Sequence, residues 1–231
     1  MRREHQMLET ISLEIAVLAV LISFTIATYS LKLLSTHGII LANLIGIVVF
    51  VLGGAVPFAT LIIFYVIAEV ATWIGRKSVK KHEQRTSSNI FGNCAAAIVA
   101  LFFGQHIAFF GAISAAFADT ISSEIGLLSR GKPWLITTFK KVEKGTDGAV
   151  SLLGSSASLV AAVIIGAVYY FFVQASGKLF IAIVAAGFFG GVCDSFLGAT
   201  FQRKGIITNT QVNFLASIFG AAVAIALAAI L

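Results

Sequence analysis

Residues 106–125 read HIAFFGAISAAFADTISSEI, an apolar stretch that ends in two acids, Asp119 and Glu124. A transmembrane helix needs about 20 predominantly apolar residues, so this stretch is long enough to cross a bilayer. An acid within the hydrocarbon region is costly and therefore indicates a functional site by default. The stretch thus predicts a membrane helix with a polar site at one end.

Seven more apolar stretches flank this one and predict an all-α, polytopic membrane helix bundle of about seven to eight transmembrane helices. The 231 residues are 58% hydrophobic and 11% charged, with a mean hydropathy of +0.99, whereas about 25% of residues are charged in a soluble domain. This composition excludes a soluble enzyme, a disordered chain and a nucleic-acid-binding protein, and residues 1–231 are expected to form a single integral-membrane domain. The expected helices cover residues 11–33, 38–54, 57–74, 89–104, 106–125, 151–174, 178–201 and 211–231.

The basic residues predict the orientation of the bundle. Of the 16 Lys and Arg residues, 13 fall in the connections after the first, third, fifth and seventh expected helices. Short loops rich in Lys and Arg remain in the cytoplasm. We therefore expect an integral protein of the cell membrane with these loops in the cytoplasm and both termini outside. The net charge of +6 has the same explanation and does not indicate binding to nucleic acid.

Four acids fall at the predicted cytoplasmic ends of helices or in the loop between them: Asp119, Glu124, Asp147 and Asp194. Residues four apart share one face of a helix, and small residues at this spacing let helices approach closely in a bilayer. The rows that contain the two helical aspartates are Gly111-Ala115-Asp119 and Gly190-Asp194-Gly198. Asp119 and Asp194 are therefore expected to project from helix-packing faces into the bundle.

The spacing of the two acids at the end of the fifth helix adds a condition. Asp119 and Glu124 are five residues apart, which places them about 140° from each other around an ideal helix. We expect both to reach one site only if the helix unwinds or ends near Ser122.

The combination of acids, bases and glycines predicts phosphate chemistry on a lipid. Carboxylates suit Mg²⁺, which commonly takes one or two protein acids together with substrate phosphates, and Lys and Arg suit phosphate oxygens. Gly145-Thr146-Asp147-Gly148 leads into a helix whose N-terminal N–H groups form an anion site. These features predict phosphoryl or nucleotidyl transfer to a membrane lipid, without the glycine-rich phosphate loop of P-loop enzymes.

Structural interpretations of the same residues stay open. Asp119 and Asp194 could form a hydrogen bond between helices, and Glu124 and Asp147 could be solvated loop acids. Glu14 and Glu69 are expected to be structural, because they lie alone or nearer to helix ends.

Motifs in chain order resemble those of a known family. Residues 118–126, ADTISSEIG, resemble A-D-T-x-x-S-E-[LI]-G, and residues 145–151 resemble G-T-[ND]-G-x-x-S. Residues 194–202, DSFLGATFQ, resemble D-S-x-x-G-A-x-x-Q, and residues 85–93 are similar to R-x-x-x-Q-V-x-x-N, with Asn89 where glutamine is usual. Together they resemble the integral-membrane family catalogued as domain of unknown function ninety-two, whose plant members are phytyl-phosphate kinases. The resemblance runs from about Leu34 to the C-terminus.

This resemblance implies a membrane-embedded, Mg²⁺-dependent isoprenyl-phosphate kinase. Such an enzyme would move the terminal phosphate of a nucleoside triphosphate, with CTP favoured and ATP possible, to phytyl or geranylgeranyl monophosphate. The resemblance assigns Mg²⁺ binding and orientation of the phosphates to Asp119, Glu124, Asp147 and Asp194. It assigns neutralisation of phosphate charge to Arg85, Lys141 and the backbone of Gly145, Thr146 and Gly148. It assigns further hydrogen bonds to Asn93, Thr120, Ser123 and Gln202.

Other classes of protein share some of these features. A CTP-dependent lipid alcohol kinase or nucleotidyltransferase would use the same acids and basic loops. A small-ion transporter would place acids near the membrane midplane, but the predicted outer half of this chain is nearly free of them. A structural membrane protein without a site is the least favoured class, since four acids gather at one face. The expected partners are the isoprenyl monophosphate and membrane lipids, and a homo-oligomer is possible.

Overall fold

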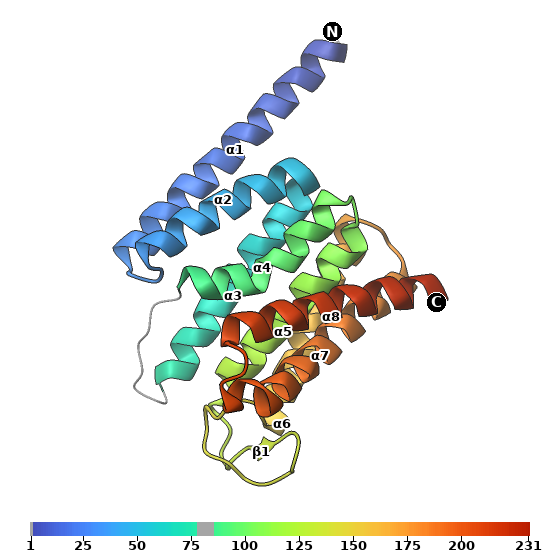
Figure 1. Cartoon of the computed structure of the whole chain (residues 1–231). Coiled ribbons are helices and arrows are strands. Elements are labelled where there is room, and N and C mark those ends of the chain that lie inside the picture. Colours follow the sequence, from blue (N-terminus) through green and yellow to red (C-terminus); the bar gives the residue numbers. More distant parts are fainter. Residues whose placement is uncertain (1, 78–85) are drawn as a thin grey trace.

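A computed structural model of the chain describes residues 2–77 and 86–231 and shows an all-α bundle with one small β-hairpin (Figure 1). The first four helices are α1 (Arg2–Ser30), α2 (Thr36–Gly53), α3 (Ala55–Lys77) and α4 (Ser87–Phe102). They are followed by α5 (His106–Gly126), the strands β1 (Trp134–Leu135) and β2 (Ala149–Val150), and α6 (Leu152–Phe172). The chain ends with α7 (Gly177–Thr200), the short 3₁₀ helix η1 (Gln202–Lys204) and α8 (Asn209–Ile230).

The helices lie where the hydropathy pattern predicts them, although α1 begins at Arg2 instead of residue 11. Within the described part of the chain, α1, α2, α3, α6, α7 and α8 are long and apolar enough to span a membrane, and α4 is a shorter apolar helix. These helices confirm the predicted all-α membrane bundle. Helix α5 has 21 residues and is long enough to span a membrane, but it is less apolar than these six helices.

Helix α5 lies at the centre of the bundle and contacts α3, α4, α6, α7 and α8. Every residue from 108 to 118 is buried, so this helix faces protein more than lipid and can carry polar residues at its end. Small residues make this packing close. A Cβ atom added at Gly190 would lie 2.3 Å from the Cβ of Ala115, and one added at Gly111 would lie 2.5 Å from the Cβ of Ala224. These contacts confirm the predicted packing role of the small-residue rows.

The helix ends that the sequence assigned to one side meet at one end of the bundle. The end of α3 contacts the end of α5, where the Thr72 hydroxyl donates a hydrogen bond to Glu124. The beginnings of α4 and α8 are so close that a Cβ atom added at Gly92 would lie 2.9 Å from the carbonyl oxygen of Thr210. The ends of α1 and α3 border one groove that is lined by Lys32 and Trp73. The ends of α1, α3 and α5 and the beginnings of α4 and α8 therefore lie at this end.

The connection between α5 and α6 forms a hairpin that extends beyond the helices (Figure 1). Trp134 pairs with Val150 and Leu135 with Ala149 in an antiparallel register. Each strand has only two residues, which is too short to give the alternating pattern from which strands are predicted. The hairpin returns the chain to the start of α6 and carries residues 145–148 to the end of α7.

Candidate active site

A cavity of about 470 Å³ opens where the ends of α5 and α7 meet the beginnings of α6 and α8. All four acids singled out in the sequence line it, although they come from three separate segments. The other predicted site residues in its wall are Ser123, Gly145, Thr146, Gly148 and Gln202. The fold therefore brings most of the predicted site together in one place.

Asp119 on α5 and Asp194 on α7 face each other in this cavity. Both side chains are partly buried, and their carboxyl groups lie close enough to interact directly. Asp147 is close enough to Asp194, and Glu124 to Asp119, for each pair to interact electrostatically. Because neighbouring negative charges destabilise each other, a cation between the two aspartates would relieve the repulsion.

The arrangement suits a cation that is shared between protein and substrate. Among the described residues, no group of three or more His, Cys, Asp and Glu side chains is placed to hold a metal ion. Mg²⁺ commonly uses one or two protein carboxylates and completes its octahedral shell with phosphate oxygens and water. The Asp119–Asp194 pair fits that requirement, whereas direct metal binding by Glu124 and Asp147 stays a prediction.

The expectation that α5 must unwind near Ser122 is wrong, because α5 remains helical to Gly126. Glu124 points to α3, where the hydroxyl of Thr72 donates a hydrogen bond of 3.0 Å to its Oε1 atom, while Asp119 meets α7. Both acids nevertheless line the main cavity and an adjoining hollow of about 170 Å³. The cavity and the hollow thus lie on different sides of the end of α5, which stays helical, and each acid can reach both.

Thr72 was not identified from the sequence, because a hydroxyl in an apolar helix often bonds only to the helix's own backbone. Thr120 and Ser123, which the sequence did identify, line the same 170 Å³ hollow. Asn89 lines it as well, and its side chain accepts hydrogen bonds from the backbone N–H and the hydroxyl of Thr86 at the start of α4. The residue that replaces the usual glutamine therefore caps a helix at the edge of the site.

Asn213 on α8 is a second residue that the sequence analysis missed. With its amide nitrogen turned toward Asp194, Asn213 donates to Oδ2 of Asp194 at 3.2 Å and to the carbonyl oxygen of Asn209 at 3.1 Å. The other end of this amide lies 3.0 Å from the buried side chain of Asn93. Asn213 thus lies between Asn93 and Asp194: one orientation of its amide donates to Asp194, and the other donates to Oδ1 of Asn93 at 3.0 Å. An amide within an apolar helix was the available signal, since such groups often bond between helices in membranes.

The glycine-containing loop is fitted tightly against α7. Gly145 and Gly148 have φ angles of +81° and +74°, in the left-handed region that favours glycine. A Cβ atom added at Gly148 would lie 2.4 Å from both the Cβ and the backbone nitrogen of Ala199. After the loop, Ser151 caps α6 by accepting a hydrogen bond of 3.1 Å from the N–H of Gly154. Ser151 also lines the cavity, so the beginning of α6 borders it, and the anion site expected there stays a prediction.

The basic residues differ in part from those predicted. Lys144 lines the cavity, and its Nζ atom donates a hydrogen bond of 2.9 Å to the carbonyl oxygen of Leu127. Lys141 is exposed on the hairpin and is not among the residues that line the cavity. Several Lys residues share this loop, so the sequence could not show which of them returns to the helix end. Arg85 lies outside the described residues.

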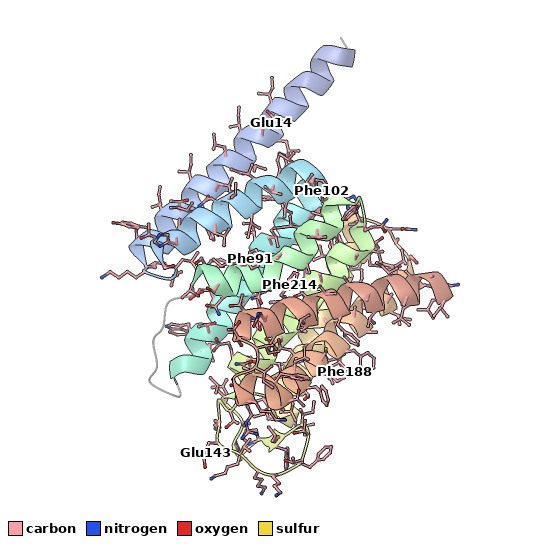
Figure 2. All side chains as sticks on the ribbon, in the orientation of Figure 1. Glu14, Phe91, Phe102, Glu143, Phe188 and Phe214 are labelled. Atoms are coloured by element: carbon pink, nitrogen blue, oxygen red, sulfur yellow. The ribbon has the colours of Figure 1, made fainter. Side chains whose placement is uncertain are left out.

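Acids elsewhere in the chain lie apart from the cavity. Figure 2 shows Glu14 on the outer part of α1 and Glu143 on the hairpin, at opposite ends of the molecule. Glu143 forms an ion pair with Lys132. Glu69 lines the groove between α1 and α3. None of these three residues lines the 470 Å³ cavity that contains Asp119, Glu124, Asp147 and Asp194.

Comparison with known proteins gives a family and several relatives. The family described as integral membrane protein DUF92 matches residues 19–221. The uncharacterized membrane protein MJ0933 of Methanocaldococcus jannaschii is 36% identical over 200 residues, which are 82% of this chain and 83% of that protein. The uncharacterized membrane protein sll0875 of Synechocystis is 28% identical over 216 residues, with 86% and 84% covered.

A plant relative matches over a smaller share of its own length. Protein VTE6, chloroplastic, of Arabidopsis thaliana is 30% identical over 214 residues, which are 83% of this chain and 64% of the plant protein. This chain therefore spans just under two thirds of that relative. No solved structure matches the chain.

Proposed function

Because this chain belongs to the integral membrane family DUF92, we propose that it is an isoprenyl-phosphate kinase embedded in the membrane. The proposed reaction uses Mg²⁺ and a nucleoside triphosphate, with CTP favoured and ATP possible, to convert phytyl or geranylgeranyl monophosphate into the diphosphate. The family resemblance described above implies this activity for plant members. The observation that carries the proposal is the cavity in which Asp119 and Asp194 face each other beside Asp147 and the loop at residues 145–148.

The proposed transfer depends on holding the two phosphates in the correct positions and does not need a strong base to activate the acceptor. A phosphate oxygen of the isoprenyl monophosphate forms a bond to the terminal phosphorus of the nucleotide, the bond from that phosphorus to the bridging oxygen breaks, and the nucleoside diphosphate leaves. The attacking oxygen already carries negative charge, so no proton has to be removed from it. Bound Mg²⁺ supplies neutralisation of the charge on the phosphates, which is a main source of catalysis in such transfers.

The protein groups have separate tasks in this proposal. Asp119 and Asp194 form the cation-binding pair, and Asn213 orients Asp194 through its amide. In the loop, the N–H group of Thr146 donates to the carbonyl oxygen of Glu143, so the N–H groups of Gly145, Asp147 and Gly148 and those at the beginning of α6 would face phosphate oxygens. Lys144 adds a positive charge at the cavity wall. Positive charges and oriented N–H groups stabilise phosphate without taking part in bond formation.

We further propose that the cavity faces the cytoplasm of a cell membrane, because the Lys-rich hairpin between α5 and α6 borders it. Cys94 and Cys193 are the two cysteines and both are free, so replacing them by Ala gives a background for labelling. In this background a membrane-impermeant maleimide should label Lys141→Cys from the cytoplasmic side alone and Lys178→Cys from the opposite side alone. Labelling of Lys141→Cys from outside would reverse the proposed orientation.

A nucleotide screen tests the reaction directly. Purified, folded protein with Mg²⁺ should convert radiolabelled geranylgeranyl or phytyl monophosphate into the diphosphate with at least one of CTP, ATP, GTP and UTP, and we expect CTP to be the best donor. The measurement is the lipid product, separated by thin-layer chromatography. Chelation of Mg²⁺ should stop its formation.

The same screen separates the alternative enzymes. An isoprenyl alcohol offered as acceptor would yield a monophosphate if the protein is a lipid alcohol kinase. A nucleotidyltransferase would release inorganic diphosphate and attach the nucleotide to the lipid. Absence of isoprenyl diphosphate with all four nucleotides would refute the proposed kinase.

A further inference from the structure

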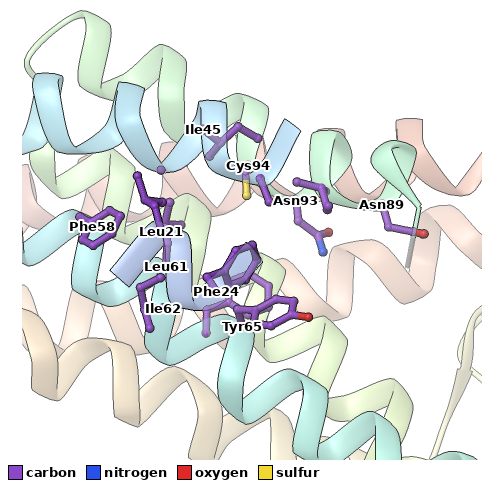
Figure 3. A pocket seen from close by; sticks show the side chains of 14 residues that line it. Leu21, Phe24, Ile45, Phe58, Leu61, Ile62, Tyr65, Asn89, Asn93 and Cys94 are labelled. Atoms are coloured by element: carbon purple, nitrogen blue, oxygen red, sulfur yellow. The ribbon is translucent and has the colours of Figure 1, made fainter. Parts of the chain in front are cut away.

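An apolar pocket of about 90 Å³ lies between α1, α2, α3 and α4 (Figure 3). Its wall is formed by Leu21 and Phe24 of α1, Ile45 of α2, Phe58 and Tyr65 of α3, and Cys94 of α4. The proposed phosphate chemistry uses none of these side chains. Aliphatic and aromatic groups of this kind bind hydrocarbon by removing it from contact with water or headgroups.

The pocket has a polar end and an apolar end. Figure 3 shows Asn89, Asn93 and the hydroxyl of Tyr65 toward one end, and Phe58 toward the other. Asn89 and Asn93 also line the 170 Å³ hollow that contains Asp119. The polar end therefore adjoins the acids, and the apolar end lies away from them.

The pocket also adjoins a wider groove of about 990 Å³ between α1 and α3. The pocket and the groove share Phe24, Ile62 and Tyr65. Other groove residues, such as Val70 and Trp73, are 53% and 59% exposed, and in a bilayer such exposed apolar side chains face lipid. A hydrocarbon chain could therefore pass from the bilayer into the pocket without crossing water.

We propose that the part of the isoprenyl tail nearest the phosphate lies in this pocket of about 90 Å³, and that the rest of the tail lies in the adjoining groove of about 990 Å³ between α1 and α3, through which the lipid enters sideways. The proposal rests on the proposed function, because that function places the phosphate headgroup among the acids. A lipid with its phosphate near Asp119 and its tail pointing past Asn93 would place its charged group at the polar end of the pocket and its hydrocarbon at the apolar end. Phe58, buried with Leu21 and Val17, closes the far end about 10 Å along α3 from Tyr65, at 1.5 Å per residue.

Photocrosslinking tests the site by binding alone. Geranylgeranyl monophosphate with a diazirine at the end of its tail is added to the purified full-length protein without nucleotide, and the labelled peptides are identified by mass spectrometry. Because the tail end lies in the groove, we expect labels on α1 and α3, and we expect an excess of unmodified geranylgeranyl monophosphate to remove them. Labels confined to α6, α7 and α8 would overturn the proposal.

Two substitutions on one helix give a matched comparison. Ala42 lines the pocket, so Ala42→Phe should fill it and lower crosslinking at least tenfold. Ile40 of the same helix is 63% exposed, so Ile40→Phe should leave crosslinking unchanged. Equal labelling of both variants, with melting temperatures like that of the wild type, would also overturn the proposal.

The outcomes separate the tail site from the proposed reaction. Labelling of α1 and α3 without phosphate transfer to any acceptor supports the tail site and refutes the kinase. Phosphate transfer with labels confined to other helices supports the kinase and refutes the tail site. The labelling map of the wild-type protein decides the question if Ala42→Phe fails to fold.

Discussion

Replacing either Asp194 or Asp119 by Asn should abolish formation of the isoprenyl diphosphate while the protein remains folded. The two carboxyl groups are in contact in the cavity, and each Asn variant keeps the size of the side chain but removes one negative charge. Loss of an outer-shell partner of a metal already costs about 10–100-fold, so losing one of the proposed ligands should lower the rate by more than about 100-fold. The measurement is the rate of lipid product formation at saturating nucleotide and Mg²⁺.

The stability of these variants separates chemistry from folding. Each substitution removes one of two like charges that face each other, so the melting temperature in detergent should stay the same or rise. Glu143→Gln is a suitable control, because Glu143 pairs with Lys132 on the hairpin and does not line the cavity. A rate near that of the wild type in Asp119→Asn and Asp194→Asn would refute the role proposed for the pair.

Gly148→Ala should lower activity on the order of 100-fold, because a displacement of about 1 Å at a reacting group can cost that much. The added Cβ atom would lie 2.4 Å from Ala199 and 2.5 Å from the carbonyl oxygen of Ser195. These neighbours belong to α7, which is held in the bundle, so the loop has to move. The loop carries Asp147, and its displacement would take that carboxylate away from Asp194.

Gly145→Ala provides the control for backbone strain. Gly145 also has a positive φ angle, of +81°, but an added Cβ atom would meet no other atom within 4 Å. Both variants therefore bear the strain of a left-handed alanine, about 1–2 kcal/mol, and only Gly148→Ala adds the collision with α7. Rates are compared at equal amounts of folded protein. Equal losses of activity in the two variants would contradict the proposed importance of the contact between the loop and α7.

The helices could be predicted from the sequence because their signal is local. An apolar stretch of about 20 residues has few alternatives to a membrane helix, since its backbone must satisfy its own hydrogen bonds in lipid. The small-residue rows through Gly111 and Gly190 likewise indicated which helix faces pack together. The central position of α5 was not predictable in this way, because three of the five helices around it, α3, α7 and α8, are not its neighbours in the chain.

The acids of the candidate site could be predicted from the sequence. The residues that donate hydrogen bonds to them, Thr72 and Asn213, could not. Carboxylates are so unfavourable in a membrane that their positions alone indicated a site. Thr72 and Asn213 carry weaker signals, because hydroxyl and amide groups have many structural uses in apolar helices. Their contacts with Glu124 and Asp194 appear only when α3 and α8 are placed beside α5 and α7.

The sequence by itself determined that this protein is a helical membrane bundle with four acids near the ends of helices on one side, because hydrophobicity and charge act residue by residue in lipid. Only the tertiary structure decided which side chains share a cavity. It joined Asp119 to Asp194, brought Lys144 to the wall instead of Lys141, and kept α5 helical while both Asp119 and Glu124 reached polar space. The physical reason is that side chains on different helices meet according to packing distances and angles, which depend on every neighbouring helix.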